Sequence, residues 1–130
     1  MIVQYYKPNS KNTGCAVSFD IGPNQKNKEP CIFVRAIKQF SWNQEKRTGS
    51  FSENAKNTEK SISLKLNEIE VGGLINAITN YCEFSAFHSY QDNETAISFK
   101  PYNKKDGTKA FSFSINRNSA NKFGIGVEMS

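Results

Sequence analysis

Aromatic and basic side chains lie close together between residues 38 and 51 of the 130-residue sequence. A single nucleic-acid strand exposes the flat faces of its bases and the negative charges of its phosphates. Proteins hold such a strand with rings that stack on the bases and with Lys or Arg that pair with phosphate. The segment supplies both kinds of side chain, in Lys38, Phe40, Trp42, Lys46, Arg47 and Phe51. These residue types indicate a surface that binds a flat, negatively charged ligand.

The same combination recurs in the C-terminal half, in the segments "SFKPYNKKDGTK" and "SINRNSANKF". From them we add Lys100, Tyr102 and Arg117 to the predicted nucleic-acid-binding site. Trp42, Phe51 and Tyr102 border polar, basic turns, so their rings are open either to a ligand or to the core. Five rings that alternate beside aliphatic residues are expected in the core: Phe19, Phe33, Phe111, Phe113 and Phe123.

Little in the sequence suits catalysis or metal binding. The single histidine, His88, has no serine in a strained G-x-S-x-G turn to pair with, and the carboxylates are scattered. Neither G-x-x-x-x-G-K-S/T nor G-x-G-x-x-G occurs. Cys15, Cys31 and Cys82 lack a C-x-x-C spacing and do not make up a zinc set with one histidine. We therefore predict that the protein is not an enzyme and holds neither metal nor cofactor.

Composition limits the class of protein. Seventeen Lys and Arg residues against twelve Asp and Glu residues give a net charge of +5, a sign that suits an anionic partner. An aromatic content of 12% is too high for a disordered chain. The sequence shows neither a signal peptide nor a run of about 18 apolar residues. We predict a single soluble domain, residues 1–130, in the cytoplasm and away from membranes.

Alternation with a period of two predicts strands along most of the chain. Before residue 67 the pattern occurs in "CAVSFDI", "CIFVRAIKQFSW" and "SISLKL"; after residue 82 it occurs in "FSAFHSY", "TAISFKPY", "KAFSFSINR" and "NKFGIGVEM". Short turns separate the later strands, which favours antiparallel pairing. We expect an α+β fold of about seven mostly antiparallel strands, with a mobile segment at residues 1–14 and a basic loop or hairpin at residues 43–60.

Residues 67–82 change to a helical period and predict one helix between the two β-rich halves. We expect one apolar stripe of this helix to face the sheet, formed by Val71, Leu74, Ile75, Ile78 and Cys82. Gly72 and Gly73 predict a close approach of the helix backbone to the sheet. The segment "NEIEVGGLINAITN" has acidic residues at its start and no Lys or Arg, so the sheet must supply any nucleic-acid contact.

The placed elements resemble phage-encoded and related bacterial single-stranded DNA-binding proteins. The resemblance covers roughly residues 15 to 128 and is carried by "IKQFSWNQEKRTGSF", "EKSISLKLNEIEVGGLINAI", "YCEFSAFHSY", "ISFKPYNKKDGTKAFSFSINRN" and "FGIGVE". Their fold is similar to that of the Whirly proteins and the transcriptional positive-coactivator family. The resemblance implies curved antiparallel sheets that pair two β-rich halves, and single-stranded DNA lying across the strands with little sequence preference.

The resemblance also implies a role in DNA replication, recombination or repair in a bacterial or phage-infected cell. It implies a homo-oligomer, a dimer or higher, formed through helices, and replication proteins as partners. Carried over to this sequence, the site residues are Lys38, Trp42, Lys46, Arg47, Phe51, Lys100, Tyr102 and Arg117. A C-terminal helix and an acidic tail, both expected from the family, do not follow the last predicted strand. Ser130, directly after that strand, would suit the N-cap of a further helix, so we expect that the natural chain or its fold continues.

Two alternatives to DNA binding stay open. Sheets with aromatic platforms also bind single-stranded RNA. A net charge of +5 is also ordinary for a soluble protein-interaction domain whose rings are all in the core.

Overall fold

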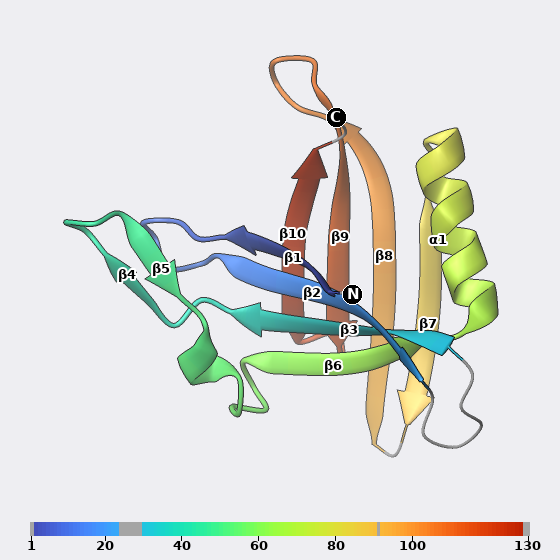
Figure 1. Ribbon diagram of the computed structural model, residues 1–130, viewed down its shortest axis with the longest axis horizontal. Coiled ribbons are helices and arrows are strands. Elements are labelled where there is room, and N and C mark those ends of the chain that lie inside the picture. Colours follow the sequence, from blue (N-terminus) through green and yellow to red (C-terminus); the bar gives the residue numbers. More distant parts are fainter. Residues whose placement is uncertain (1, 24–29, 91, 129–130) are drawn as a thin grey trace. The chain divides into compact units, whose positions relative to one another are not determined.

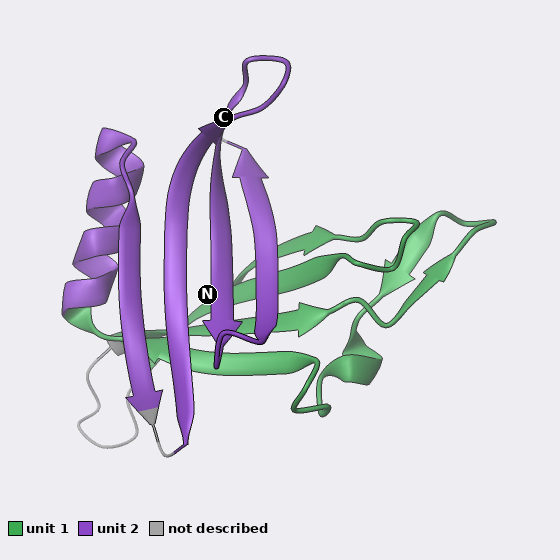
Figure 2. Cartoon of the chain, turned by 180° about the vertical axis from the view of Figure 1, so that it is seen from behind, with its two compact units in different colours: residues 1–68 green, residues 69–130 purple. Residues whose placement is uncertain are grey.

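The computed structural model describes residues 2–23, 30–90 and 92–128. The chain divides into two compact units, Met1–Glu68 and Ile69–Ser130, which are coloured separately in Figure 2. We refer to them as unit 1 and unit 2.

Unit 1 contains an antiparallel sheet in which the strands follow the order β1-β2-β3-β6. The strands are β1 (Ile2–Lys7), β2 (Cys15–Pro23), β3 (Pro30–Lys38) and β6 (Ser61–Leu66). Two short strands, β4 (Ser41–Asn43) and β5 (Thr48–Ser50), form a separate hairpin, and the 3-10 helix η1 (Ser52–Asn54) follows it (Figure 1). β1 lies at one edge of the four-stranded sheet and β6 at the other.

The two faces of the unit 1 sheet differ in chemistry because successive side chains point to opposite faces. One face is apolar and buried, and it carries Val17, Val34, Ala36, Ile62 and Leu66. The other face, which we call the open face, carries the alternate residues of the same strands: Tyr6, Ser18, Phe33, Arg35, Ser63 and Lys65.

Unit 2 is an antiparallel meander in the order β10-β9-β8-β7. Its strands are β7 (Phe84–Tyr90), β8 (Asn93–Asn103), β9 (Lys109–Arg117) and β10 (Asn121–Glu128), and the helix α1 (Glu68–Asn80) precedes them. On one face the Phe99 and Phe111 rings stack with centroids 4.2 Å apart. The largest fully buried side chains on that face are Ile97, Phe113, Ile115 and Phe123.

Small residues form the buried side of α1, so the predicted apolar stripe is wrong in part. Ala77 is fully buried, whereas Ile75 and Ile78 are exposed. A Cβ on Gly73 would lie 2.8 Å from two ring atoms of Phe84, so the helix backbone packs directly on that ring. The close approach predicted from the two glycines is thus met at Gly73, and a Cβ at the neighbouring glycine would meet open space.

The predicted curved, Whirly-like sheets of about seven strands are wrong. The described part of the chain forms ten strands in three separate sheets of four, two and four strands. β1 was missed because its side chains are nearly all exposed and show no apolar alternation. The predicted strand at residues 31–42 instead ends at Lys38, and residues 41–50 pair with each other as the β4–β5 hairpin. The mostly antiparallel pairing and the single helix are observed.

The two adjacent helix glycines should respond oppositely to alanine. Gly72→Ala should raise the free energy of unfolding by about 0.5–1 kcal/mol, because alanine restricts the unfolded chain and meets nothing in the fold. Gly73→Ala should lower it by about 1–3 kcal/mol through overpacking against Phe84. Urea unfolding followed by circular dichroism measures both. Equal stabilisation by the two variants would contradict the close packing of α1 on β7.

Candidate nucleic-acid interface

Exposed rings and basic side chains lie together on the open face of unit 1. Tyr6 is 57% exposed and Phe33 is 38% exposed. The register places Phe33 beside Lys65 of β6, and it places Arg35 between Ser18 and Ser63. Rings beside cations are the side chains that hold a single nucleic-acid strand.

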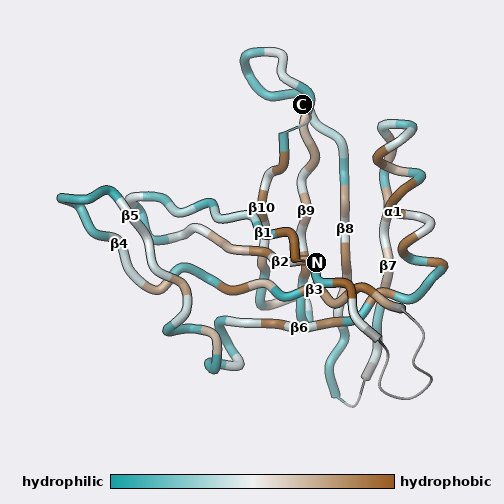
Figure 3. The backbone as a smooth tube through the Cα atoms, viewed as in Figure 1, coloured by the Kyte–Doolittle hydropathy of each residue, from teal (hydrophilic) through white to brown (hydrophobic). Residues whose placement is uncertain are grey.

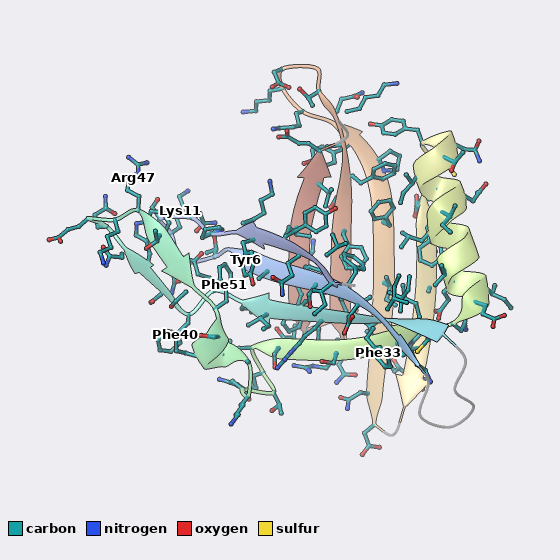
Figure 4. All side chains as sticks on the ribbon, in the orientation of Figure 1. Tyr6, Lys11, Phe33, Phe40, Arg47 and Phe51 are labelled. Atoms are coloured by element: carbon teal, nitrogen blue, oxygen red, sulfur yellow. The ribbon has the colours of Figure 1, made fainter. Side chains whose placement is uncertain are left out.

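A groove of about 480 Å³ opens at one end of the open face, a volume within the range of small-ligand sites. Its wall includes Tyr6 and Phe51, whose ring centroids lie 5.7 Å apart at an angle of 57° (Figure 4). Phe51 is only 8% exposed, so it supports Tyr6 from behind and leaves most of the accessible ring surface to Tyr6. The other lining residues come from β1, β2, β3, β5 and the segment around η1: Gln4, Ala16, Val17, Ser18, Arg35, Ile37, Gly49, Ser50, Ser52 and Ala55.

The polar groups of the groove are held in fixed directions. Arg35 donates from Nη2 to the carbonyl oxygen of Ala55 at 2.8 Å, which anchors the guanidinium at the lining. Two serines also line the groove, and the Ser50 and Ser52 hydroxyls each donate to Glu53 at 2.9 Å. Both hydrogen bonds lower the pKa of the exposed Glu53 carboxyl, the bond from Ser52 more than the bond from Ser50. A charged donor and a serine-bound carboxylate therefore lie at or beside the same groove.

One buried amide connects the loops at this end of unit 1. Gln39 is 5% exposed, and its Oε1 accepts from the backbone N–H groups of Asn9 at 3.0 Å and Gly14 at 3.1 Å. Its Nε2 donates to the carbonyl oxygens of Asn9 and Ser41, both at 3.1 Å. A Cβ on Gly49 would lie 2.9 Å from that Nε2, so the hairpin packs tightly on the amide. Gln39 therefore ties the β1–β2 turn to the base of the β4–β5 hairpin.

The loops that Gln39 connects carry exposed cations. Lys11 lies in the β1–β2 turn, and Lys46 and Arg47 lie in the turn of the hairpin, whose hydrophilic tip is visible in Figure 3. Arg47 has a φ of 53°, a left-handed conformation that is unfavourable for a side chain of this size. Strain of this kind is often kept at functional positions.

Six of the predicted site residues lie in unit 1. Lys38 ends β3, Phe40 is exposed, and Trp42 is half-buried with its Nε1 donating to Gln44 at 3.0 Å. Phe40 accepts a hydrogen bond at its carbonyl oxygen from the Asn12 side chain, again across the two loops. The remaining three are Lys46 and Arg47, in the turn of the hairpin, and Phe51, in the wall of the groove.

The other three predicted site residues lie in unit 2. Lys100 and Tyr102 share one face of β8, and Lys100 Nζ is 3.8 Å from Glu83. Arg117 lies on the opposite face of that sheet, with its guanidinium 5.8 Å from the centre of the Phe123 ring. The sheet of unit 2 therefore does not bring Arg117 together with the other two.

The predicted site did not include Tyr6, Phe33, Arg35 or Lys11, and Phe33 was expected in the core. The alternation in "IFVRAIK" already separates Phe33 and Arg35 from Val34 and the rest of the buried face. A strand face that combines a ring with a cation, as Phe33 and Arg35 do, is therefore the sequence signal that could have indicated this part of the site.

The excess positive charge belongs entirely to unit 1. Residues 1–68 contain eleven Lys and Arg against six Asp and Glu, which gives +5. Residues 69–130 contain six of each and are neutral. Unit 2 also pairs Lys104 with Glu128. An anionic polymer is therefore attracted mainly to unit 1.

No protein-family model matches the chain, and no curated protein or solved structure matches it. Across the described ranges, no helix is both long and apolar enough to cross a membrane. In the same ranges, no three His, Cys, Asp or Glu side chains gather where they could hold a metal ion.

Loss of the Gln39 amide should loosen the loops that it connects. Gln39→Ala removes the partner of the Asn9 N–H and of the buried Gly14 N–H, which should lower the free energy of unfolding by about 1–3 kcal/mol. Gln44→Ala, a matched change of an exposed glutamine in the hairpin, should change it by about 0.5 kcal/mol or less. Urea unfolding monitored by Trp42 fluorescence compares the two. Similar losses in both variants would contradict the connecting role of Gln39.

Proposed function

We propose that the chain is a sequence-tolerant single-stranded DNA-binding protein that protects unwound DNA in replication, recombination or repair. The observation that carries the proposal is the open face of unit 1, where the exposed Phe33 ring lies in register beside Lys65, and Arg35 lies two residues further along the same face of β3. Stacking contributes about 1–3 kcal/mol per base, and counterion release adds a term that falls with salt. Unit 1 has exposed rings that can stack on bases and Lys and Arg side chains that can pair with phosphates.

The geometry supports a single strand better than a duplex. Bases of a duplex are stacked on one another and offer only their edges in the grooves, usually to a helix with basic residues. The one helix of the described chain, α1, contains no Lys or Arg. The exposed rings lie instead on a sheet face and along a groove, where unstacked bases have access to them.

The proposal includes the cytoplasm of a bacterial or phage-infected cell, and a homo-oligomer. Self-association is supported by Ile75 and Ile78, which are exposed and lie within one turn of each other on α1. Exposed apolar side chains that gather on one side of a helix often mark a protein contact.

Cations of unit 1 and unit 2 should contribute unequally to DNA affinity. Replacing Lys11, Lys46 and Arg47 together by alanine should weaken binding of oligo(dT) by about tenfold or more at low salt. It should also reduce the slope of log affinity against log salt by about two, since each phosphate contact on a single strand contributes about 0.7. Fluorescence anisotropy of a labelled oligonucleotide measures both quantities.

The matched control for the charge variant replaces three lysines of unit 2, Lys100, Lys105 and Lys122. This variant loses the same formal charge but should leave the salt slope nearly unchanged. A larger loss in the control would place the interface in unit 2, and a salt-independent affinity of the unaltered protein would argue against nucleic-acid binding altogether.

Arg47 should show opposite effects on stability and binding. Arg47→Gly should raise the free energy of unfolding by about 1 kcal/mol, because glycine adopts a φ of 53° without strain. The same variant should bind oligo(dT) more weakly, because a cation is lost. Arg47→Lys keeps both the charge and the strain and should change neither quantity much. If Arg47→Gly binds as tightly as the unaltered protein, the strained arginine does not contact DNA.

A further inference from the structure

We propose that the groove behind Tyr6 holds one base of the bound strand and selects keto bases, thymine, uracil or guanine, over cytosine and adenine. The inference rests on the proposed function, and it adds a base preference to a protein otherwise tolerant of sequence.

The shape of the groove suits an unstacked base. Its volume of about 480 Å³ holds a planar ring with room for the attached sugar. The Tyr6 and Phe51 rings are inclined at 57° to each other, so they form one wall rather than a continuous flat platform. Tyr6 is the more exposed of the two rings and supplies the stacking surface.

The hydrogen-bonding groups of the groove include Gln4 and Ser18, which can both donate and accept, and one group of fixed polarity. The guanidinium of Arg35 can only donate, and its bond to Ala55 O fixes its place at the lining. The hydroxyl protons of Ser50 and Ser52 are directed to Glu53, and the Ser50 oxygen also pairs with the Ser41 hydroxyl at 2.6 Å, so the Ser52 oxygen is the better placed to accept from a ligand. The lining therefore supplies a group that can only donate, Arg35, and an oxygen that can accept, that of Ser52.

A keto base matches this polarity along one edge. Uracil and thymine place an acceptor, O4, next to a donor, N3–H, and guanine places O6 next to N1–H. The keto oxygen then accepts from Arg35, and the ring N–H donates to a serine oxygen. Cytosine and adenine present an amino donor and a ring acceptor in the same places, which would set donor against donor at Arg35.

The test compares oligo(dU) with oligo(dC), which differ only along this edge. Affinities are measured by competition against a labelled oligonucleotide at about pH 8, where cytosine N3 is neutral. The unaltered protein should bind oligo(dU) about tenfold more tightly, the discrimination expected of a well-placed base contact. In Arg35→Met the ratio of the two affinities should fall towards one. Ala55 O keeps a hydrogen bond from the Ser61 hydroxyl, so this variant should fold.

Lys65→Met is the matched control, because Lys65 lies on the open face but does not line the groove. It should weaken binding of both oligonucleotides equally and leave their ratio unchanged. Tight binding with equal affinities in the unaltered protein would overturn the base selection while leaving DNA binding intact. A preference that survives Arg35→Met would also overturn it. Failure to bind either oligonucleotide at low salt would overturn the proposed function itself.

Discussion

The candidate interface depends on the point at which β3 stops. A strand that continued beyond Lys38 would extend the four-stranded sheet, and no hairpin would form beside the open face. Gln39 opposes this, because its buried side chain bonds backbone groups of Asn9 and Gly14 in the β1–β2 turn and of Ser41 in β4. Buried polar groups must be paired, so the position of this amide fixes the path of the chain around it. The hairpin then places Phe51 against Tyr6, and the groove follows from that contact.

In unit 2 the main constraint is the close packing of α1 on the sheet. Its helix approaches the sheet through Gly73 and Ala77, where the backbone itself meets the Phe84 ring. Such close packing excludes larger side chains from the buried side, and the isoleucines of α1 are consequently exposed. Unit 2 is also electrically neutral, and its Lys100 and Lys104 lie next to carboxylates. In the proposed function, unit 2 is therefore suited to packing and association, while unit 1 attracts the nucleic acid.

Local alternation predicts the elements of this protein better than it predicts their arrangement. The pattern in "CAVSFDI" and the later strands depends only on which neighbours are apolar, and those strands are observed. The same rule does not reveal β1, whose exposed edge position requires no apolar alternation, or the break after Lys38, which depends on contacts between distant segments. For the candidate site, residue type is enough to predict Phe40 and Arg47 as members, but the exposure of Phe33 depends on which face of a sheet is covered. Local alternation separates the two faces of the strand, but which of them is covered is tertiary information.

The carboxylate beside the groove bears on how a strand would lie in the proposed complex. Glu53 is tied to Ser50 and Ser52, and its pKa is lowered by those hydrogen bonds, so it is ionised at neutral pH. A negative charge at this place repels phosphate, whereas the cations of the connected loops, Lys11 and Arg47, attract it. The sugar-phosphate backbone would then follow the loops, and the groove would receive the uncharged part of a nucleotide. Charge of both signs thus supports the same orientation, with phosphates outside and a base against Tyr6.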